Sequence, residues 1–166
     1  RVSALGLAVP VVAAACGNGG GAEAGAAAAR GGEPAGLIDW EVFDQARAEE
    51  LAAAGSLVFV DVTADWCFTC KTNERLVLET EEIAALFAEH AVVAMKADWT
   101  NQDPAIAAFL AEHGRYSIPF YLLYRPGAPP LPFSELLTKP AVAGAVAEAA
   151  SRSARLGGAR DAAAGS

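Results

Sequence analysis

The sequence has few of the residues that most catalytic and nucleic-acid sites are built from. It contains only two histidines and three cysteines, and 12 basic residues stand against 20 acidic ones for a net charge of -8. Its 166 residues include no basic stripe, no Gly-rich phosphate loop, no Ser/His/Asp arrangement and no internal repeat. These absences argue against a nucleic-acid partner and an organic cofactor, and they favour proteins or small thiols as partners.

The apolar stretch at the N-terminus is too short for a complete transmembrane helix. Residues 2–15 are apolar around Pro10, whereas a bilayer span needs about 20 residues. We interpret residues 1–16 as the end of a transmembrane helix, or alternatively as a truncated lipoprotein signal in which Cys16 is lipidated; otherwise Cys16 is an idle thiol. Both interpretations place the rest of the chain outside the cytoplasmic membrane.

The remaining chain divides into three parts by composition. Residues 17–36 are mostly glycine and alanine, which cannot bury enough surface to offset their ordering entropy, so we expect a flexible linker. Residues 37–150 have the length of one domain and carry alternating apolar patterns. Residues 151–166 are expected to form a disordered tail.

Two cysteines follow the most apolar run of that domain. The run at 57–60 leads through Asp61 to Cys67 and Cys70, and the pattern beyond has helical spacing. This is typical of a strand-to-helix junction, with Cys67 at the helix N-terminus, where unpaired N–H groups stabilise a thiolate. Cys70, one turn further in, is expected to be better buried, so the pair suits a nucleophile and a resolving thiol.

The cysteine pair has three alternative interpretations. A structural disulfide across so short a loop adds only about 2 kcal/mol to the free energy of unfolding, so it would stabilise the fold little. A zinc site needs two more ligands, but only Cys16, His90 and His113 are available. A two-thiolate copper(I) site on a small ferredoxin-like domain remains the alternative from a different functional class.

The periodicity predicts an α/β domain with a mixed sheet covered by helices on both faces. The first helix is expected to begin near Trp40, with Asp39 as a possible N-cap, and to end near Gly55. The other expected elements are a strand at 57–63, helices from Cys67 and from Thr80, a strand at 91–97, a helix from Pro104 to Gly114, a strand at 120–124, an edge strand at 131–137 and a helix from Pro140.

Several segments together resemble a known family. They are Phe59-Val60-Asp61, Ala64-Asp65-Trp66-Cys67, Cys70-Lys71, Ala97-Asp98-Trp99-Thr100 and Gly114-Arg115-Tyr116-Ser117-Ile118-Pro119. Over about residues 37–150 they are similar to the C-terminal thioredoxin-like domains of the DsbD family of thiol:disulfide interchange proteins. The resemblance implies a thioredoxin-like fold.

The resemblance also implies roles for individual residues. Asp61, an acid in an apolar strand, matches a semi-buried proton acceptor beneath the cysteines; its other interpretation is a partly solvated strand end. Glu74, one turn past Cys70, matches an acid that tunes the first thiol, or else is a solvated helix residue. The substrate-binding residues would be Trp66, Phe68, Ile118 and Pro119, with Pro119 in the cis form and the Ile118 backbone pairing with a partner segment.

The function predicted from these patterns is thiol-disulfide exchange in the reducing direction. Carboxylates near the pair raise the cost of a thiolate and favour a reductant. The resemblance implies that a transmembrane electron-donor domain reduces the Cys67–Cys70 disulfide, which then reduces periplasmic thiol-disulfide proteins. We expect a monomeric catalytic domain, tethered on the periplasmic side of the bacterial inner membrane, with no metal or cofactor beyond the disulfide. The alternative with the same chemistry is a free-standing, membrane-tethered reductase for cytochrome c maturation.

Overall fold

The computed structural model describes residues 36–164. The interpretations of residues 1–16, including Cys16, and of the linker as far as residue 35 therefore lie outside the described residues. Among the helices from residue 36 onward, none has both the length and the apolar character needed to cross a membrane.

A five-stranded mixed sheet forms the centre of the domain. Its strands are β1 (Trp40–Val42), β2 (Val58–Thr63), β3 (Val93–Asp98), β4 (Phe120–Arg125) and β5 (Ala128–Pro132), in the order β1-β3-β2-β4-β5. The pairs β1–β3 and β2–β3 are parallel, whereas β2–β4 and β4–β5 are antiparallel. Every residue of β2 is buried, because β2 is the central strand and both of its faces are covered.

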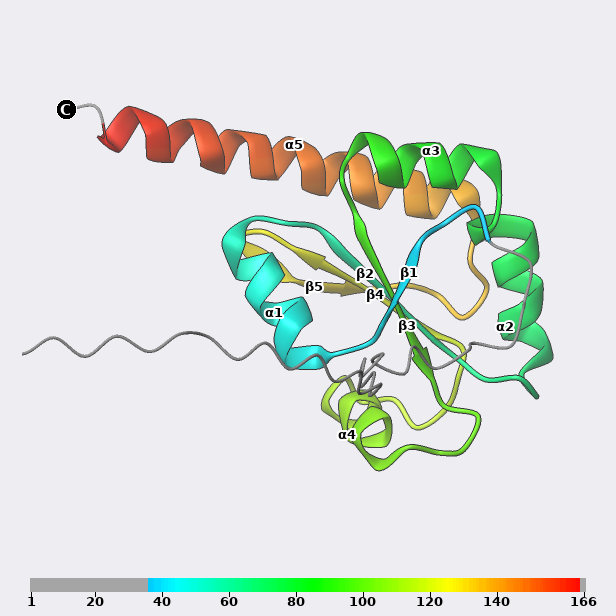
Figure 1. Ribbon diagram of the computed structural model, residues 1–166. Helices are drawn as coiled ribbons and strands as arrows, with labels where there is room; N and C mark the ends of the chain where they lie inside the picture. Colours follow the sequence, from blue (N-terminus) through cyan, green and yellow to red (C-terminus); the bar gives the residue numbers. More distant parts are fainter. Residues whose placement is uncertain (1–35, 165–166) are drawn as a thin grey trace, which may run out of the picture. The chain divides into compact units, whose positions relative to one another are not determined.

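Helices cover both faces of this sheet, as Figure 1 shows. Helices α3 (Glu81–Glu89) and α5 (Lys139–Ala164) lie on one face, and α1 (Gln45–Ala54) and α4 (Pro104–Glu112) lie on the other. Side chains alternate along β2, so Phe59 packs with Phe87 and Val146 on the first face while Val60 packs with Phe109 on the second. The predicted thioredoxin-like arrangement of a mixed sheet between helices is confirmed.

The segment after β2 carries the cysteines. It forms α2 (Phe68–Asn73), which continues directly as one turn of π-helix, η1 (Glu74–Leu78). Val77 and Leu78 of this turn are buried in the core beside Phe59. A π-turn inserts one residue into the helical repeat and thereby changes which side chains face inward.

The prediction for the start of the first helix is wrong. Trp40–Val42 forms the edge strand β1, and α1 begins at Gln45, with the carboxylate of Asp44 rather than Asp39 accepting the N–H of Arg47. Strand β1 pairs in register with β3. This long-range pairing overrides the helical spacing of the local sequence.

Two predictions near the C-terminus are also wrong. The edge strand lies at Ala128–Pro132 instead of 131–137, since an edge strand tolerates prolines whose missing N–H groups would face solvent. The expected tail from residue 151 is part of α5, which continues to Ala164. The Ser153 hydroxyl donates to the Gly55 carbonyl at 3.0 Å, and Leu156 lies over Gly127, where a Cβ would come within 2.6 Å of its Cδ1. These contacts and a high alanine content support the extra turns.

Candidate active site

The two cysteines lie where the central strand passes into α2. Cys67 is the N-cap of α2, and its Sγ accepts the N–H of Cys70 at 3.2 Å. The two residues form a disulfide with a Cα–Cα distance of 5.3 Å. Cys67 keeps 7% of its surface exposed and Cys70 none, so an attacking group can reach Cys67 first. The predicted position of Cys67 at a helix start, with Cys70 buried behind it, is confirmed.

The loop that follows β3 holds the segment before Cys67 in place. The Asp65 N–H donates to the Thr100 hydroxyl at 2.9 Å, and the Trp66 indole donates to the Thr100 carbonyl at 3.1 Å. Asp98 accepts the N–H of Thr100 at 2.9 Å, and hydrogen bonding from Thr100 holds the pKa of Asp98 below its usual range. Asp98 and Thr100 of the Asp-Trp-Thr motif therefore fix the conformation of the segment before Cys67 through hydrogen bonds.

A cis peptide bond lies beside the disulfide. It joins Ile118 to Pro119, as the resemblance implied, and Pro119 is buried. Ile118 packs against the cluster formed by Ala64, Cys67 and Cys70. The end of the loop before β4 thus brings Ile118, with Pro119 next to it in the chain, to the cysteine pair. That these two residues bind substrate stays a prediction.

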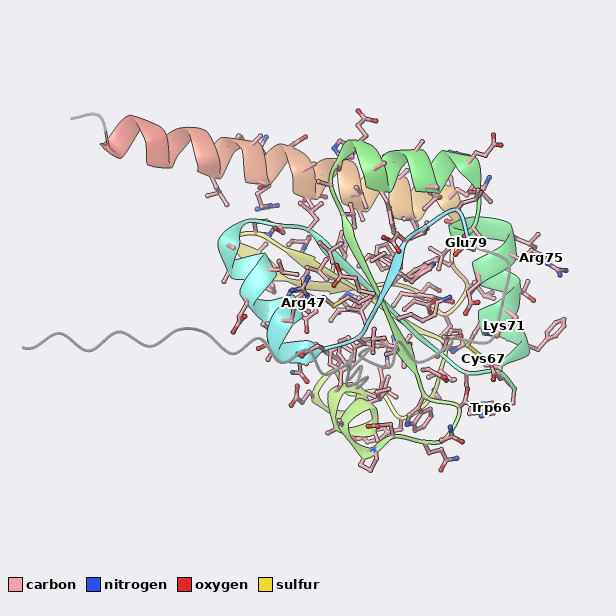
Figure 2. All side chains as sticks on the ribbon, viewed as in Figure 1. Arg47, Trp66, Cys67, Lys71, Arg75 and Glu79 are labelled. Atoms are coloured by element: carbon pink, nitrogen blue, oxygen red, sulfur yellow. A yellow bond between two sulfur atoms is a disulfide. The ribbon has the colours of Figure 1, made fainter. Side chains whose placement is uncertain are left out.

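Three aromatic side chains near this site project into solvent. Trp66 and Phe68, which flank Cys67 in the sequence, are 56% and 85% exposed. Figure 2 shows Trp66 and Cys67 together at the start of α2. Tyr116, two residues before Ile118, is 80% exposed and was not predicted as a site residue. Exposed aromatic side chains of this kind are enriched at protein interfaces.

Asp61 is fully buried in β2, deeper than the predicted semi-buried position. Neither of its carboxyl oxygens has a hydrogen-bond partner among residues 36–164. Burial, followed by the negative charge of Glu74, raises the pKa of Asp61 to about 8, although Lys96 and Lys71 oppose the shift. At neutral pH the Asp61 carboxyl is therefore mostly protonated.

Glu74 is held in a network rather than in solvent. Its side chain is 12% exposed, and its Oε1 accepts the Thr63 hydroxyl proton at 2.6 Å. Its Oε2 lies 3.4 Å from the Lys71 ammonium and 3.8 Å from that of Lys96. Two cations thus compensate the charge that Glu74 brings near Asp61.

Sequence reasoning missed Lys96. The β2–β3 register places Lys96 opposite Asp61, while Tyr121 of β4 stands opposite Asp61 on the other side. Burial, and then the charge of Asp61, raises the pKa of Tyr121, whose hydroxyl accepts from the Asn73 amide at 3.0 Å. The available signal in the sequence was a lysine inside the apolar pattern of β3. The sequence does not show that this lysine stands opposite Asp61, because that pairing depends on the strand order.

No group of three or more His, Cys, Asp or Glu side chains between residues 36 and 164 is arranged to hold an ion. The copper(I) alternative assumed a small ferredoxin-like domain, and the strand order β1-β3-β2-β4-β5 with a cysteine pair after the central strand is that of the thioredoxin-like fold.

Comparisons with known proteins agree with this geometry. The sequence model of the thioredoxin-like family matches residues 39–126. Thiol:disulfide interchange protein DsbD 1 of Pseudomonas aeruginosa is 32% identical over 78 residues, which are 47% of this chain but only 13% of that protein.

Two solved structures show the same fold. The DsbD C-terminal domain of Neisseria meningitidis in the reduced form has a TM-score of 0.52 at 19% identity and covers 66% of this chain and 99% of that domain. A thioredoxin from Thermus thermophilus has a TM-score of 0.53 at 14% identity, over 67% of this chain and 87% of that protein.

Proposed function

Because the chain belongs to the thioredoxin-like family, we propose that it reduces protein disulfides through Cys67 and Cys70. It is a thioredoxin-like thiol-disulfide oxidoreductase with a Cys-x-x-Cys pair, similar to the DsbD C-terminal domain. The observation that carries the proposal is the asymmetry of the pair, in which an accessible sulfur at a helix N-terminus stands in front of a buried one. This arrangement separates the attacking thiol from the resolving thiol.

The proposed reaction begins with the reduced pair. The Cys67 thiolate attacks one sulfur of a partner disulfide, a mixed disulfide forms, and the other partner sulfur leaves as a thiolate that takes up a proton. Cys70 then loses its proton and attacks the Cys67 Sγ, which releases the second partner thiol. Two electrons pass to the partner, and the Cys67–Cys70 disulfide is regenerated.

Asp61 is proposed as the acceptor of the Cys70 proton. It is a buried acid on the central strand that leads to the cysteines, and no hydrogen bond within the described part of the chain occupies its oxygens. With a pKa of about 8, its ionised fraction rises between pH 7 and pH 9. The resolving step is therefore expected to become faster over this range, because more Asp61 is able to accept a proton.

The proposed direction of electron flow rests on charge and on resemblance. The negative charge of Glu74, and that of Asp61 in its ionised fraction, makes a thiolate at Cys67 more costly, and a couple with a less stable thiolate is more reducing. We propose that a membrane-embedded cysteine pair supplies the electrons, as resemblance to DsbD suggests, and that periplasmic thiol-disulfide proteins receive them. Trp66, Phe68, Ile118 and Pro119 would form the surface that meets these partners.

Reduction of a protein disulfide tests the proposal. The reduced protein is mixed with excess insulin, and new insulin thiols are counted after a rapid acid quench. The expected result is one insulin disulfide reduced for each Cys67–Cys70 pair oxidised, which confirms the proposed chemistry. Oxidation of the pair without new insulin thiols, or no oxidation at all, would contradict it.

A further inference from the structure

Glu79, which follows η1, holds the beginning of the described chain. One carboxylate oxygen accepts the N–H groups of Leu37 and Ile38 at 2.6 and 3.4 Å. The other oxygen accepts the indole N–H of Trp40 at 2.6 Å. Figure 2 shows Glu79 beside β1, at the opposite end of the α2–η1 segment from Cys67. The Glu79 carboxylate therefore fixes both the backbone that leads into β1 and the ring of Trp40.

The Trp40 ring supports the ammonium group of Lys96. The Lys96 Nζ lies 4.7 Å from the Trp40 ring centroid, within the range of a cation–π interaction. The ring also packs against the core residue Phe59, with 6.4 Å between ring centroids. This packing helps to fix the position of the Trp40 ring. The same Lys96 Nζ is 3.8 Å from Oε2 of Glu74. A chain of direct contacts thus runs from Glu79 through Trp40 and Lys96 to Glu74.

We propose that Trp40, anchored by Glu79, is a positioning residue that keeps the Lys96 ammonium beside Glu74 and so sets the charge near the Cys67–Cys70 pair. The inference rests on the proposed function, because it assigns these residues to the same redox reaction. It also connects the redox centre to the backbone of Leu37 and Ile38, at the beginning of the described residues.

A lysine needs such support because its stem is long and flexible. An ammonium on four rotatable carbons loses much rotamer freedom when it is held in one place, and the face of a tryptophan is the best aromatic surface for holding it. The charges that act on Asp61 come from Glu74 of η1, Lys96 of β3, Lys71 of α2 and Glu79, and Tyr121 of β4 stands opposite Asp61. If the Lys96 ammonium moves away from Glu74, the net charge around Glu74 and Asp61 becomes more negative. A thiolate at Cys67 then becomes less favourable, so the pKa of Cys67 rises.

A double-mutant cycle on the reduced full-length chain tests the proposal. The rate of alkylation of Cys67 by iodoacetamide is measured from pH 5 to pH 10, with Cys67 distinguished from Cys16 by mass spectrometry of peptides. Lys96→Met is expected to slow alkylation at pH 7 about threefold, which corresponds to about half a pKa unit. Trp40→Leu is expected to slow it in the same direction. The double variant should react no more slowly than Lys96→Met alone, because Trp40 acts through Lys96.

The controls separate positioning from folding. Trp40→Phe keeps an aromatic face and should stay close to the wild-type pH profile, and Lys139→Met, which removes a cation paired with Glu82, should not move it. A purely structural role would lower the melting temperature of the Trp40 variants and leave the alkylation profile unchanged. Trp40→Met replaces Trp40→Leu if the latter does not fold. An unchanged profile in Lys96→Met, or in Trp40→Leu or the Trp40→Met that replaces it, would overturn the proposal. Effects that multiply in the double variant would also overturn it.

The measurement is independent of the proposed function. Alkylation of the reduced protein needs neither a partner nor turnover, so the Trp40–Lys96 coupling can fail while the wild type still reduces insulin. Conversely, a protein without reductase activity can still show the coupling. The two results therefore identify which of the two proposals is wrong.

Discussion

Cys67→Ser is expected to abolish the reduction of protein disulfides, down to the level of a reaction without the protein. Serine does not form a nucleophilic oxyanion at neutral pH, and Cys70 cannot replace Cys67 because none of its surface is exposed. Cys70→Ser should behave differently. Its Cys67 can still attack a partner, but the resolving thiol is missing, so the mixed disulfide persists.

The two variants are compared by trapping. Each also carries Cys16→Ser, so that the remaining cysteine of the pair is the only thiol in the chain. After incubation with oxidised insulin, non-reducing electrophoresis should show a mixed disulfide for Cys70→Ser and none for Cys67→Ser. Equal trapping by both variants would contradict the assignment of Cys67 as the attacking thiol.

Asp61→Asn is expected to stabilise the folded protein above neutral pH. In the unfolded chain the Asp61 carboxyl ionises near 3.8, whereas in the folded protein its pKa is about 8. Between these values the unfolded state releases a proton that the folded state keeps, so the free energy of unfolding falls as pH rises from about 4 to 8. Asparagine cannot ionise and avoids this loss. The expected gain in the free energy of unfolding is on the order of 3 kcal/mol at pH 8.

Urea unfolding of the oxidised protein at pH 4, 6 and 8 measures this effect. The difference between Asp61→Asn and wild type should be smallest at pH 4 and grow toward pH 8. Asp39→Asn is a suitable control, since Asp39 is exposed and the same change of side chain should leave stability nearly unaltered. A stability difference that is the same at all three pH values would mean that Asp61 does not titrate as its burial requires.

The features that local sequence determines were predicted well. The run at 57–63 is apolar on both faces because β2 is the central strand, and the helical pattern after it placed Cys67 at a helix start. Asp61 was recognised because an acid inside such a run has no structural reason to be there. The helix predicted from Pro104 is α4, and the Asp103 carboxylate caps it.

The features that depend on distant partners were not predicted. Helical spacing around Trp40 concealed a strand, because the pairing of β1 with β3 and the bond from the Trp40 indole to Glu79 involve residues far along the chain. The sequence alone does not distinguish Lys96 from other strand residues, because its position opposite Asp61 depends on the β2–β3 register. Predicting which charges surround Asp61 therefore needs the strand order as well as the sequence.

The reduction potential of the Cys67–Cys70 pair tests the central claim, that this protein is a reductant, most directly. The wild type is equilibrated with defined ratios of reduced and oxidised dithiothreitol or glutathione at pH 7, and the reduced fraction is counted by mass spectrometry after thiols are blocked. We expect a potential more negative than about −200 mV, on the side of the reducing thioredoxins. A value near about −120 mV, typical of a strong oxidant of thiols, would contradict the account.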